Sequence, residues 1–154
     1  MRPVLVRIDD RLIHGQVMTG WLKVTGAKKI IIADDFVAKD KFSLQVLKMA
    51  APSGITVEAL TVDDAAKALT ENSSGDEKVI VLCKTPREPK RLLDLGVQFD
   101  KLNVGGVGSK PGRKPFYRNI SLSEEEISIL KEIATRGVKV EFRIVPDDKP
   151  FFLE

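Results

Sequence analysis

Residues 4–17 read VLVRIDDRLIHGQV, and they contain the only histidine of the chain, His14. The apolar run over 4–9 predicts a buried strand, and the pattern that follows predicts a helix over 15–25. In an open α/β sheet, the residues between a strand and the next helix border the crevice in which ligands bind. This segment therefore predicts an α/β fold and places a candidate site in its loop.

Apolar runs and helical patterns continue to alternate along nearly the whole chain. Several of the apolar runs are continuous, which is typical of strands that are buried on both faces of a parallel sheet. The further strands are expected at 29–33, 55–60, 78–83, 101–104 and 138–145, and the further helices at 40–51, 62–71, 86–95 and 124–136. The pattern predicts a single α/β domain over 1–154, with an open, mainly parallel, doubly wound sheet and helices on both faces.

Further residues in this pattern indicate where the predicted elements end and how they pack. Ser123 and Glu126 have the spacing of a capping box, and Gly137 is placed to end the last helix. Trp21 lies on the apolar face of the first predicted helix, so we expect it to anchor packing. The last residues, 146–154, are expected to form a strand edge or an interface tail.

The composition is that of an ordinary globular domain, and 154 residues are enough to bury a core without disulfides or metals. Lysine and arginine number 25 and aspartate and glutamate 22, so the net charge of +3 is too small to indicate nucleic-acid binding. The single cysteine, Cys83, lies in an apolar run, which predicts a buried structural thiol and a reducing cytosol. We find neither an apolar signal segment nor an apolar run long enough to cross a membrane.

His14 has the chemistry to carry a phosphoryl group. A neutral imidazole is a good nucleophile that is largely unprotonated near neutral pH. Arginine is the side chain best shaped to hold a phosphoryl group, and Arg7 and Arg11 both precede the histidine. Gly15 lets the backbone come close to whatever the imidazole meets.

Other interpretations of this segment are open. Asp9 and Asp10 are also typical turn or helix-cap residues, and Arg11 is then a solvated charge paired with them. A metal site is not indicated, because there is no second histidine and Cys83 is distant in sequence. A serine hydrolase is not indicated either, because the Gly-x-Ser-x-Gly motif is absent.

A second loop is expected at the same crevice if the strands at 4–9 and 78–83 are neighbours. It reads Lys84-Thr85-Pro86 and precedes a predicted helix. The Thr85 hydroxyl and a free backbone N–H would then donate to a phosphoryl oxygen. The alternative is a plain helix cap by Thr85.

The stretch 105–119 is predicted to be irregular. Gly105-Gly106-Val107-Gly108 lacks the spacing of a dinucleotide-binding motif, so a tight turn is the better interpretation. The basic residues that follow are either a solvated loop or a docking patch for an acidic partner. The positive rim expected around the crevice consists of Arg7, Arg11, Lys84, Lys110, Arg113 and Lys114.

The chain also resembles a known family. Residues 7–17 are similar to the signature of the IIB component of the mannose/fructose/sorbose family of the bacterial sugar phosphotransferase system. The resemblance covers nearly the whole chain. The other matching segments are Ile30-Ile31-Ile32-Ala33-Asp34-Asp35, Lys84-Thr85-Pro86 and Asn103-Val104-Gly105-Gly106.

This resemblance implies that His14 accepts a phosphoryl group on Nδ1 from a phosphohistidine of a IIA protein. It would then pass the group to a sugar that is imported through the membrane subunits IIC and IID. Asp10 and Arg11 correspond to the neighbours of the histidine in the active loop, and Thr85 to a position where the family often has serine or threonine. The implied phosphate-binding set is Arg7, Asp10, Arg11, Gly15 and Thr85.

The resemblance further implies a separate IIB polypeptide, located in the cytoplasm and peripherally associated with the membrane subunits. Its substrate would be a hexose or a related sugar, it would use no cofactor or metal, and a homodimer is a candidate assembly. Two alternatives remain at this point: a non-catalytic α/β module that binds a phosphate or nucleotide, and a regulatory protein that uses phosphorylation of His14 as a signal.

Overall fold

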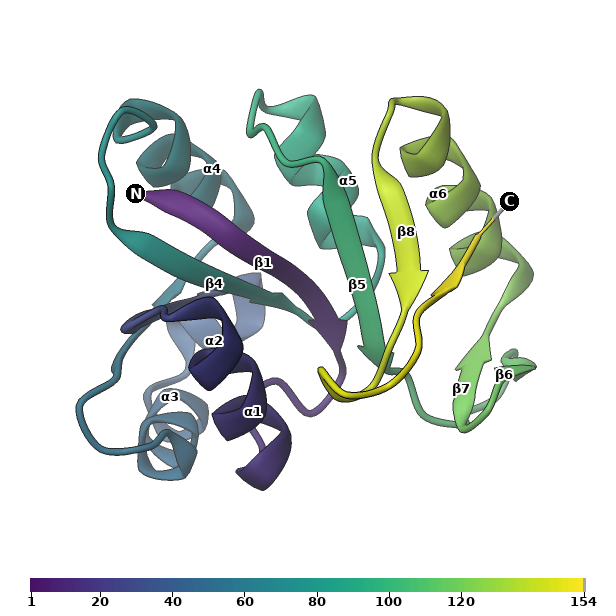
Figure 1. Cartoon of the computed structure of the whole chain (residues 1–154), viewed down its shortest axis with the longest axis horizontal. Helices are drawn as coiled ribbons and strands as arrows, with labels where there is room; N and C mark the ends of the chain where they lie inside the picture. Colours follow the sequence, from purple (N-terminus) through teal and green to yellow (C-terminus); the bar gives the residue numbers. More distant parts are fainter. Residues whose placement is uncertain (154) are drawn as a thin grey trace.

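A seven-stranded sheet forms the centre of the computed structural model, which describes residues 1–153. Its strand order is β3-β2-β4-β1-β5-β8-β9 (Figure 1). The strands are β1 (Arg2–Asp9), β2 (Lys29–Ala33), β3 (Thr56–Leu60), β4 (Lys78–Cys83), β5 (Lys101–Gly106), β8 (Lys139–Phe142) and β9 (Phe151–Phe152). All neighbours pair in parallel except β8 and β9, so the predicted mainly parallel sheet is confirmed.

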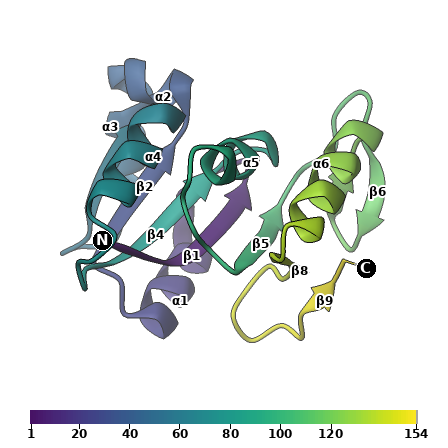
Figure 2. The same ribbon diagram turned by 90° about the horizontal axis from the view of Figure 1, so that it is seen from above.

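Helices cover both faces of this sheet, as predicted. They are α1 (Gly15–Thr25), α2 (Asp35–Lys39), α3 (Lys41–Ala50), α4 (Val62–Glu71), α5 (Arg87–Asp94) and α6 (Glu124–Thr135). One apolar core lies between the sheet and α1, α2 and α3, and the other between the sheet and α4, α5 and α6. Figure 2 shows α1 on one side of the sheet and α5 and α6 on the other. Within residues 1–153, the structure has no helix with the length and apolar character needed to cross a bilayer.

Strand β1 occupies the middle of the sheet, between β4 and β5. The parallel register places Ile8 beside both Cys83 of β4 and Val104 of β5. The first strand and the strand at 78–83 are therefore neighbours, which was the condition for placing the loop at 84–86 beside the loop of His14. The chain leaves β1 toward α1 on one face and leaves β4 toward α5 on the other, which is the topological switch point at which such sheets bind ligands. The loops that follow β1 and β4 consequently open at the same edge.

Three parts of the chain differ from the sequence-based expectation. Helix α2 has five residues, too few to show a helical period. The stretch expected to be irregular contains a hairpin, β6 (Lys114–Tyr117) and β7 (Ile120–Leu122), whose strands are too short for a clear alternation. The predicted strand 138–145 ends at Phe142, because the chain then turns back through hydrogen bonds between Val145 and Asp148.

Several local signals are confirmed. Ser123 and Glu126 form the capping box of α6, and Gly137, with a φ of 87°, follows its end. The tail forms the edge strand β9, and Tyr117 of β6 stacks on Phe151 with ring centres 4.9 Å apart. Cys83 is completely buried, and burial raises the pKa of its thiol well above the usual range. It is a structural residue, as expected.

Candidate active site

His14 lies directly in front of α1, at the carboxyl end of β1. It is the N-cap residue of α1 and has an extended backbone with a φ of −146°. The loop before it turns through Leu12, whose φ is 58°, and the helix starts through Gly15, whose φ is 45°. A left-handed leucine costs of the order of 1–3 kcal/mol and persists only where packing enforces it; Leu12 is 1% exposed. This tight loop presents the His14 imidazole at the surface, with 21% of the side chain exposed.

A buried carboxylate orients the imidazole. The Nε2 atom of His14 lies 2.8 Å from Oδ2 of Asp9, whose side chain is only 1% exposed. The other oxygen of Asp9 accepts the backbone N–H of Arg11 at 3.1 Å. A carboxylate beside Nε2 favours the tautomer in which Nε2 carries the proton, so Nδ1 keeps its lone pair. Asp9 is also a turn residue, because its carbonyl accepts the N–H of Leu12 at 2.9 Å, so the turn interpretation is confirmed and the contact with His14 is an additional role.

Arg7 holds Asp9 from behind and does not line the crevice. Its guanidinium donates to Oδ2 of Asp9 at 3.1 Å, to Oδ1 of Asn103 at 2.6 Å and to the carbonyl of Arg143 at 3.1 Å. It also lies over the Trp21 ring, 5.4 Å from the ring centre. Burial lowers the pKa of Arg7, and the Asp9 carboxylate offsets part of that effect. The side chain is 0% exposed, so the expectation that Arg7 contacts phosphate at a positive rim is wrong.

Two glycines of β5 make room for this buried ion pair. A Cβ on Gly105 would overlap the guanidinium of Arg7, and a Cβ on Gly106 would lie 2.7 Å from Oδ1 of Asp9. Both residues belong to a strand, so the tight turn expected from Gly105-Gly106-Val107-Gly108 is wrong. The glycine pair exists because β5 passes closer to the side chains of β1 than any Cβ allows.

Asp10 and Arg11 have different positions in the loop. Oδ2 of Asp10 accepts the backbone N–H of Gly108 at 2.8 Å, so this carboxylate ties the loop to the end of β5. The Arg11 side chain is 61% exposed, and its Nε lies 3.9 Å from Oδ1 of Asp9. Arg11 is thus the arginine of this loop that is free to meet an incoming phosphoryl group.

The loop after β4 lies at the same edge, but its donors are already occupied. The Thr85 hydroxyl donates to Oε2 of Glu88 at 2.7 Å, and the backbone N–H groups of Thr85 and Lys84 donate to Oε1 at 2.9 and 3.1 Å. The expectation of a free N–H at Thr85 is therefore wrong. Burial raises the pKa of Glu88, although the hydrogen bonds from Thr85 act in the opposite direction.

Arg113 is also not part of a positive rim. It forms a two-pronged ion pair with Glu126, at 3.0 and 2.9 Å, and donates to the carbonyl of Gly108 at 2.9 Å. Its side chain is 5% exposed. Burial alone would raise the pKa of Glu126, but the hydrogen bonds from Arg113 and Ser123 lower it overall. The docking patch expected from Lys110, Arg113 and Lys114 is thus reduced to its two exposed lysines.

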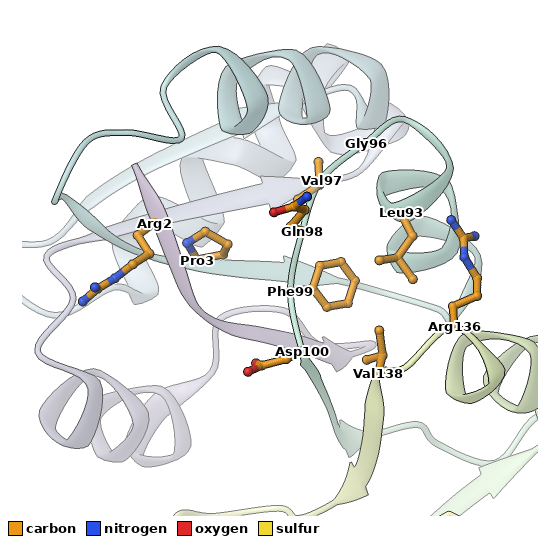
Figure 3. Close-up of a pocket in the computed structure, with 10 residues that line it drawn as sticks. All are labelled: Arg2, Pro3, Leu93, Gly96, Val97, Gln98, Phe99, Asp100, Arg136 and Val138. Carbon is orange, nitrogen blue, oxygen red and sulfur yellow. The ribbon is translucent and has the colours of Figure 1, made fainter.

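A cavity lies apart from this site. It measures about 650 Å³ and lies at the amino ends of β1, β5 and β8, where Pro3, Phe99 and Val138 line it (Figure 3). His14 lies at the opposite, carboxyl end of β1. A smaller hollow of about 240 Å³ adjoins the loop, between Arg11, Lys84 and the side chain of Phe42 on α3. The His14 imidazole, with 21% of its side chain exposed, lines neither of these two hollows.

The fold and this edge of the sheet define an α/β domain with a partly exposed histidine that is oriented for nucleophilic chemistry. The comparisons with known proteins specify the class. The model of the family described as "PTS system sorbose subfamily IIB component" matches residues 3–153. The chain belongs to this family of the sugar phosphotransferase system, and it is a phosphotransferase component that passes a phosphoryl group toward a sugar.

Individual relatives agree over nearly the whole chain. The sorbose-specific EIIB component of Klebsiella pneumoniae is 38% identical over 148 residues, which cover 96% of this chain and 90% of that protein. The crystal structure of the IIBSor domain of the sorbose permease from the same organism superposes with a TM-score of 0.93 at 37% identity, covering 98% of this chain and 93% of that one. The mannose-specific EIIAB component of Escherichia coli K12 is 35% identical over 144 residues, or 94% of this chain and 45% of that protein.

We predict that Gly105→Ala disrupts the site through Arg7. The added methyl group has no space beside the guanidinium, so either Arg7 or β5 must shift. Overpacking of this kind typically costs about 1–3 kcal/mol of unfolding free energy. Urea denaturation measures this cost, and Gly20→Ala is the matched control, because a Cβ there meets Pro146 at an ordinary 3.4 Å. Equal stability of the two variants would show that the Arg7 pocket is not tightly packed.

Proposed function

We propose that His14 is the residue that carries the phosphoryl group, and that it does so on Nδ1. The observation that supports this most directly is the 2.8 Å contact between Nε2 of His14 and Asp9, which leaves Nδ1 as the ring nitrogen with a lone pair. This agrees with the nitrogen implied by the family resemblance. The proposal includes a single IIB domain over 1–154.

The reaction has two displacements. In the first, the Nδ1 lone pair of His14 attacks the phosphorus of a phosphohistidine on IIA. The new N–P bond forms as the old one breaks, and the donor imidazole keeps the electron pair of the broken bond. In the second, a sugar hydroxyl oxygen attacks the phosphorus, the hydroxyl proton is lost, and His14 leaves as a neutral imidazole. Donor and acceptor atoms are both nitrogen in the first step, so that step is nearly balanced in free energy.

Residues around His14 supply the electrostatic stabilisation that such transfers need. When Nδ1 bonds to phosphorus while Nε2 keeps its proton, the ring becomes positive, and the Asp9 carboxylate offsets that charge. The exposed guanidinium of Arg11 is placed to reach the phosphoryl oxygens. The first backbone N–H groups of α1 follow His14 directly, and the N-terminus of a helix favours an anion. Gly15 belongs to this set through its backbone.

IIB components work with a IIA protein and with membrane IIC and IID subunits. We propose that this chain takes its phosphoryl group from such a IIA protein and delivers it to a hexose or related sugar at IIC and IID, with which it associates peripherally. The relative named EIIAB component supports the first pairing, because this chain covers 45% of it. A homodimer remains part of the proposal.

The surface around His14 offers IIA a mixed polar and apolar footprint. Arg11 is exposed and Lys84 partly so, and Phe42 and Val46 of α3 expose 77% and 49% of their surfaces beside the same hollow. Lys110 is also exposed and lies in the segment between β5 and β6. We propose that IIA covers the His14 loop together with this part of α3. Such a contact is transient and depends on salt where lysines take part.

We predict that His14→Gln folds normally and accepts no phosphate, because no other histidine exists in the chain. The parent protein, incubated with phosphoenolpyruvate, the general phosphotransferase proteins and IIA, should acquire one acid-labile, base-stable phosphate. Intact-mass spectrometry detects it, and ³¹P NMR distinguishes Nδ1-phosphohistidine from the Nε2 isomer. Undiminished phosphorylation of His14→Gln would overturn the proposal, and an Nε2-linked phosphate would overturn the role of Asp9.

We predict that Arg11→Lys slows the transfer although it keeps the charge. A lysine ammonium cannot reproduce the two-pronged contact of a guanidinium with phosphoryl oxygens. The loss of one such donor typically lowers the rate by about 10²–10³. Single-turnover transfer from phospho-IIA in a quench-flow instrument measures the effect, with Lys23→Arg on the exposed side of α1 as the control. A rate equal to that of the parent would show that Arg11 is only a surface charge.

We predict that Lys110→Glu combined with Lys114→Glu lowers the association rate with IIA mainly at low salt. Arg113 is left intact, because its reversal would break the ion pair with Glu126 and confuse docking with folding. The matched control reverses Lys67 and Lys131, which are exposed on α4 and α6. Stopped-flow kinetics at low and high ionic strength give the comparison. Identical rates for both double variants would exclude the two lysines from the docking surface.

A further inference from the structure

The contacts of Arg7 continue away from His14 into the interior of the sheet. Oδ1 of Asn103 accepts from Arg7 at 2.6 Å, and Nδ2 of Asn103 donates to Oε2 of Glu141 at 3.0 Å. Asn103 and Glu141 are 0% and 2% exposed. A continuous chain of hydrogen bonds, buried from Glu141 to Asp9, therefore connects Glu141 on β8 with the partly exposed His14, through Asn103, Arg7 and Asp9.

The strand register builds this chain. Arg7 of β1 pairs with Asn103 of β5, and Asn103 pairs with Glu141 of β8. Residues paired in this way on adjacent strands project from the same face of a sheet and contact each other. A slip of one residue in either pairing would turn a member of the chain to the opposite face. The three polar side chains thus form a row across three neighbouring strands.

Stability alone does not account for this row. Replacing buried ion pairs and polar groups by apolar residues of similar volume is often neutral or stabilising, because charges lose their hydration when they are buried. Lys101 and Arg143 each lie 4.0 Å from Oε1 of Glu141, the oxygen that Asn103 does not contact, so these cations do not account for the hydrogen bond from Asn103 to Oε2. At its other end the row contacts Asp9, and the Asp9 carboxylate contacts His14, the candidate nucleophile. The polar character of the row therefore acts on the orientation of the imidazole.

We propose that Asn103 and Glu141 are positioning residues, which hold Arg7 so that the Asp9 carboxylate stays aligned with Nε2 of His14. The inference rests on the proposed role of His14 and concerns how its ring is set. Glu141 accepts from the amide nitrogen of Asn103, as does the carbonyl of Arg143 at 3.2 Å. Two acceptors on one side fix the orientation of the amide, so its oxygen faces the guanidinium. Without Glu141 only the Arg143 carbonyl holds the amide nitrogen, so a rotated amide that presents its NH₂ group to Arg7 becomes more populated.

The test uses the fact that the chain has one histidine. The ¹⁵N NMR shifts of the two ring nitrogens, recorded at a pH at which the imidazole is neutral, report the fraction of the Nε2–H tautomer without any assignment work. Phosphorylation by phosphoramidate, a small phosphoryl donor, reports the nucleophilicity of His14 without any partner protein. The variants are Glu141→Gln, which still offers an acceptor oxygen, and Glu141→Leu, which does not. Asn103→Leu interrupts the chain at another member and serves if Glu141→Leu does not fold.

Glu141→Leu and Asn103→Leu should lower the Nε2–H fraction and slow phosphorylation by about 2- to 30-fold, the range typical of substitutions within a coupled network. Glu141→Gln should restore both properties toward the parent. The control is Phe142→Leu, which disturbs the next residue of β8 on the opposite face of the sheet, where Phe142 packs against Phe116 and Tyr117. It should lower the melting temperature and leave the tautomer unchanged.

The inference is overturned if Glu141→Leu or Asn103→Leu matches Phe142→Leu in tautomer and in phosphorylation rate, because the row is then only structural. It is also overturned if Glu141→Gln behaves like Glu141→Leu, since the acceptor oxygen would have no part. If the proposed role of His14 as phosphoryl carrier is wrong, these experiments give a different pattern of results. The parent would then take no phosphate from phospho-IIA, while the tautomer comparison would still decide the role of the row.

Discussion

The buried ion pair between Arg7 and Asp9 is the interaction on which the rest of this site depends. A guanidinium and a carboxylate that are removed from water must satisfy each other and their remaining hydrogen-bonding groups. This requirement explains features that are far apart in the sequence. Gly105 and Gly106 leave space for the two side chains, Asn103 takes a further Arg7 donor, and the Arg11 backbone N–H satisfies the second oxygen of Asp9.

The two arginines of the active segment consequently have different roles. Arg7 is fully buried, and three hydrogen bonds to oxygen atoms and one contact with the Trp21 ring hold it in place. The Arg11 side chain, in contrast, is 61% exposed. A buried arginine cannot follow a phosphoryl group from one partner to the next, but it can hold a carboxylate in place through both encounters. An exposed arginine can adjust to each partner. In the proposed reaction, Arg7 thus keeps the imidazole orientation fixed through Asp9. Arg11, four positions later in the chain, makes the adaptable contact with the phosphoryl group.

Much of the fold follows from local sequence pattern. Helices α1 and α4 have the predicted bounds, as have strands β2 and β4, because their apolar periods are long and bounded by clear signals. The doubly wound pattern does not by itself give the strand order, so the pairing of β1 with β4 is known only from the structure. The hairpin β6–β7 and the five-residue α2 are too short to produce such a pattern.

The site was predictable only in part. The motif around His14 indicates the residue that we propose to carry the phosphoryl group, and the exposure of Arg11 is compatible with its expected role. The roles of Arg7, Asp9 and Arg113 depend on partners such as Asn103, which is 96 positions from Arg7, and local pattern carries no information about such pairings. One feature of the sequence does indicate that Asp9 is paired. It ends a continuous apolar strand, and an ionisable residue that is buried there must find a partner. Its neighbours in the sheet determine which partner that is.

The same ion pair resolves an electrostatic conflict in the proposed reaction. The carboxylate that orients His14 would by itself repel an incoming phosphoryl dianion, because like charges about 4 Å apart at an effective dielectric constant of about 20 repel by about 4 kcal/mol. Arg7 contacts the same oxygen of Asp9 that His14 contacts, so the pair is close to neutral when viewed from the crevice. The directional hydrogen bond to Nε2 is retained, while the field that the phosphoryl group meets comes from Arg11 and the N-terminus of α1. Once Nδ1 carries phosphorus and the ring becomes positive, the Asp9 oxygen is already in place to stabilise it, and no side chain has to move at the moment of transfer.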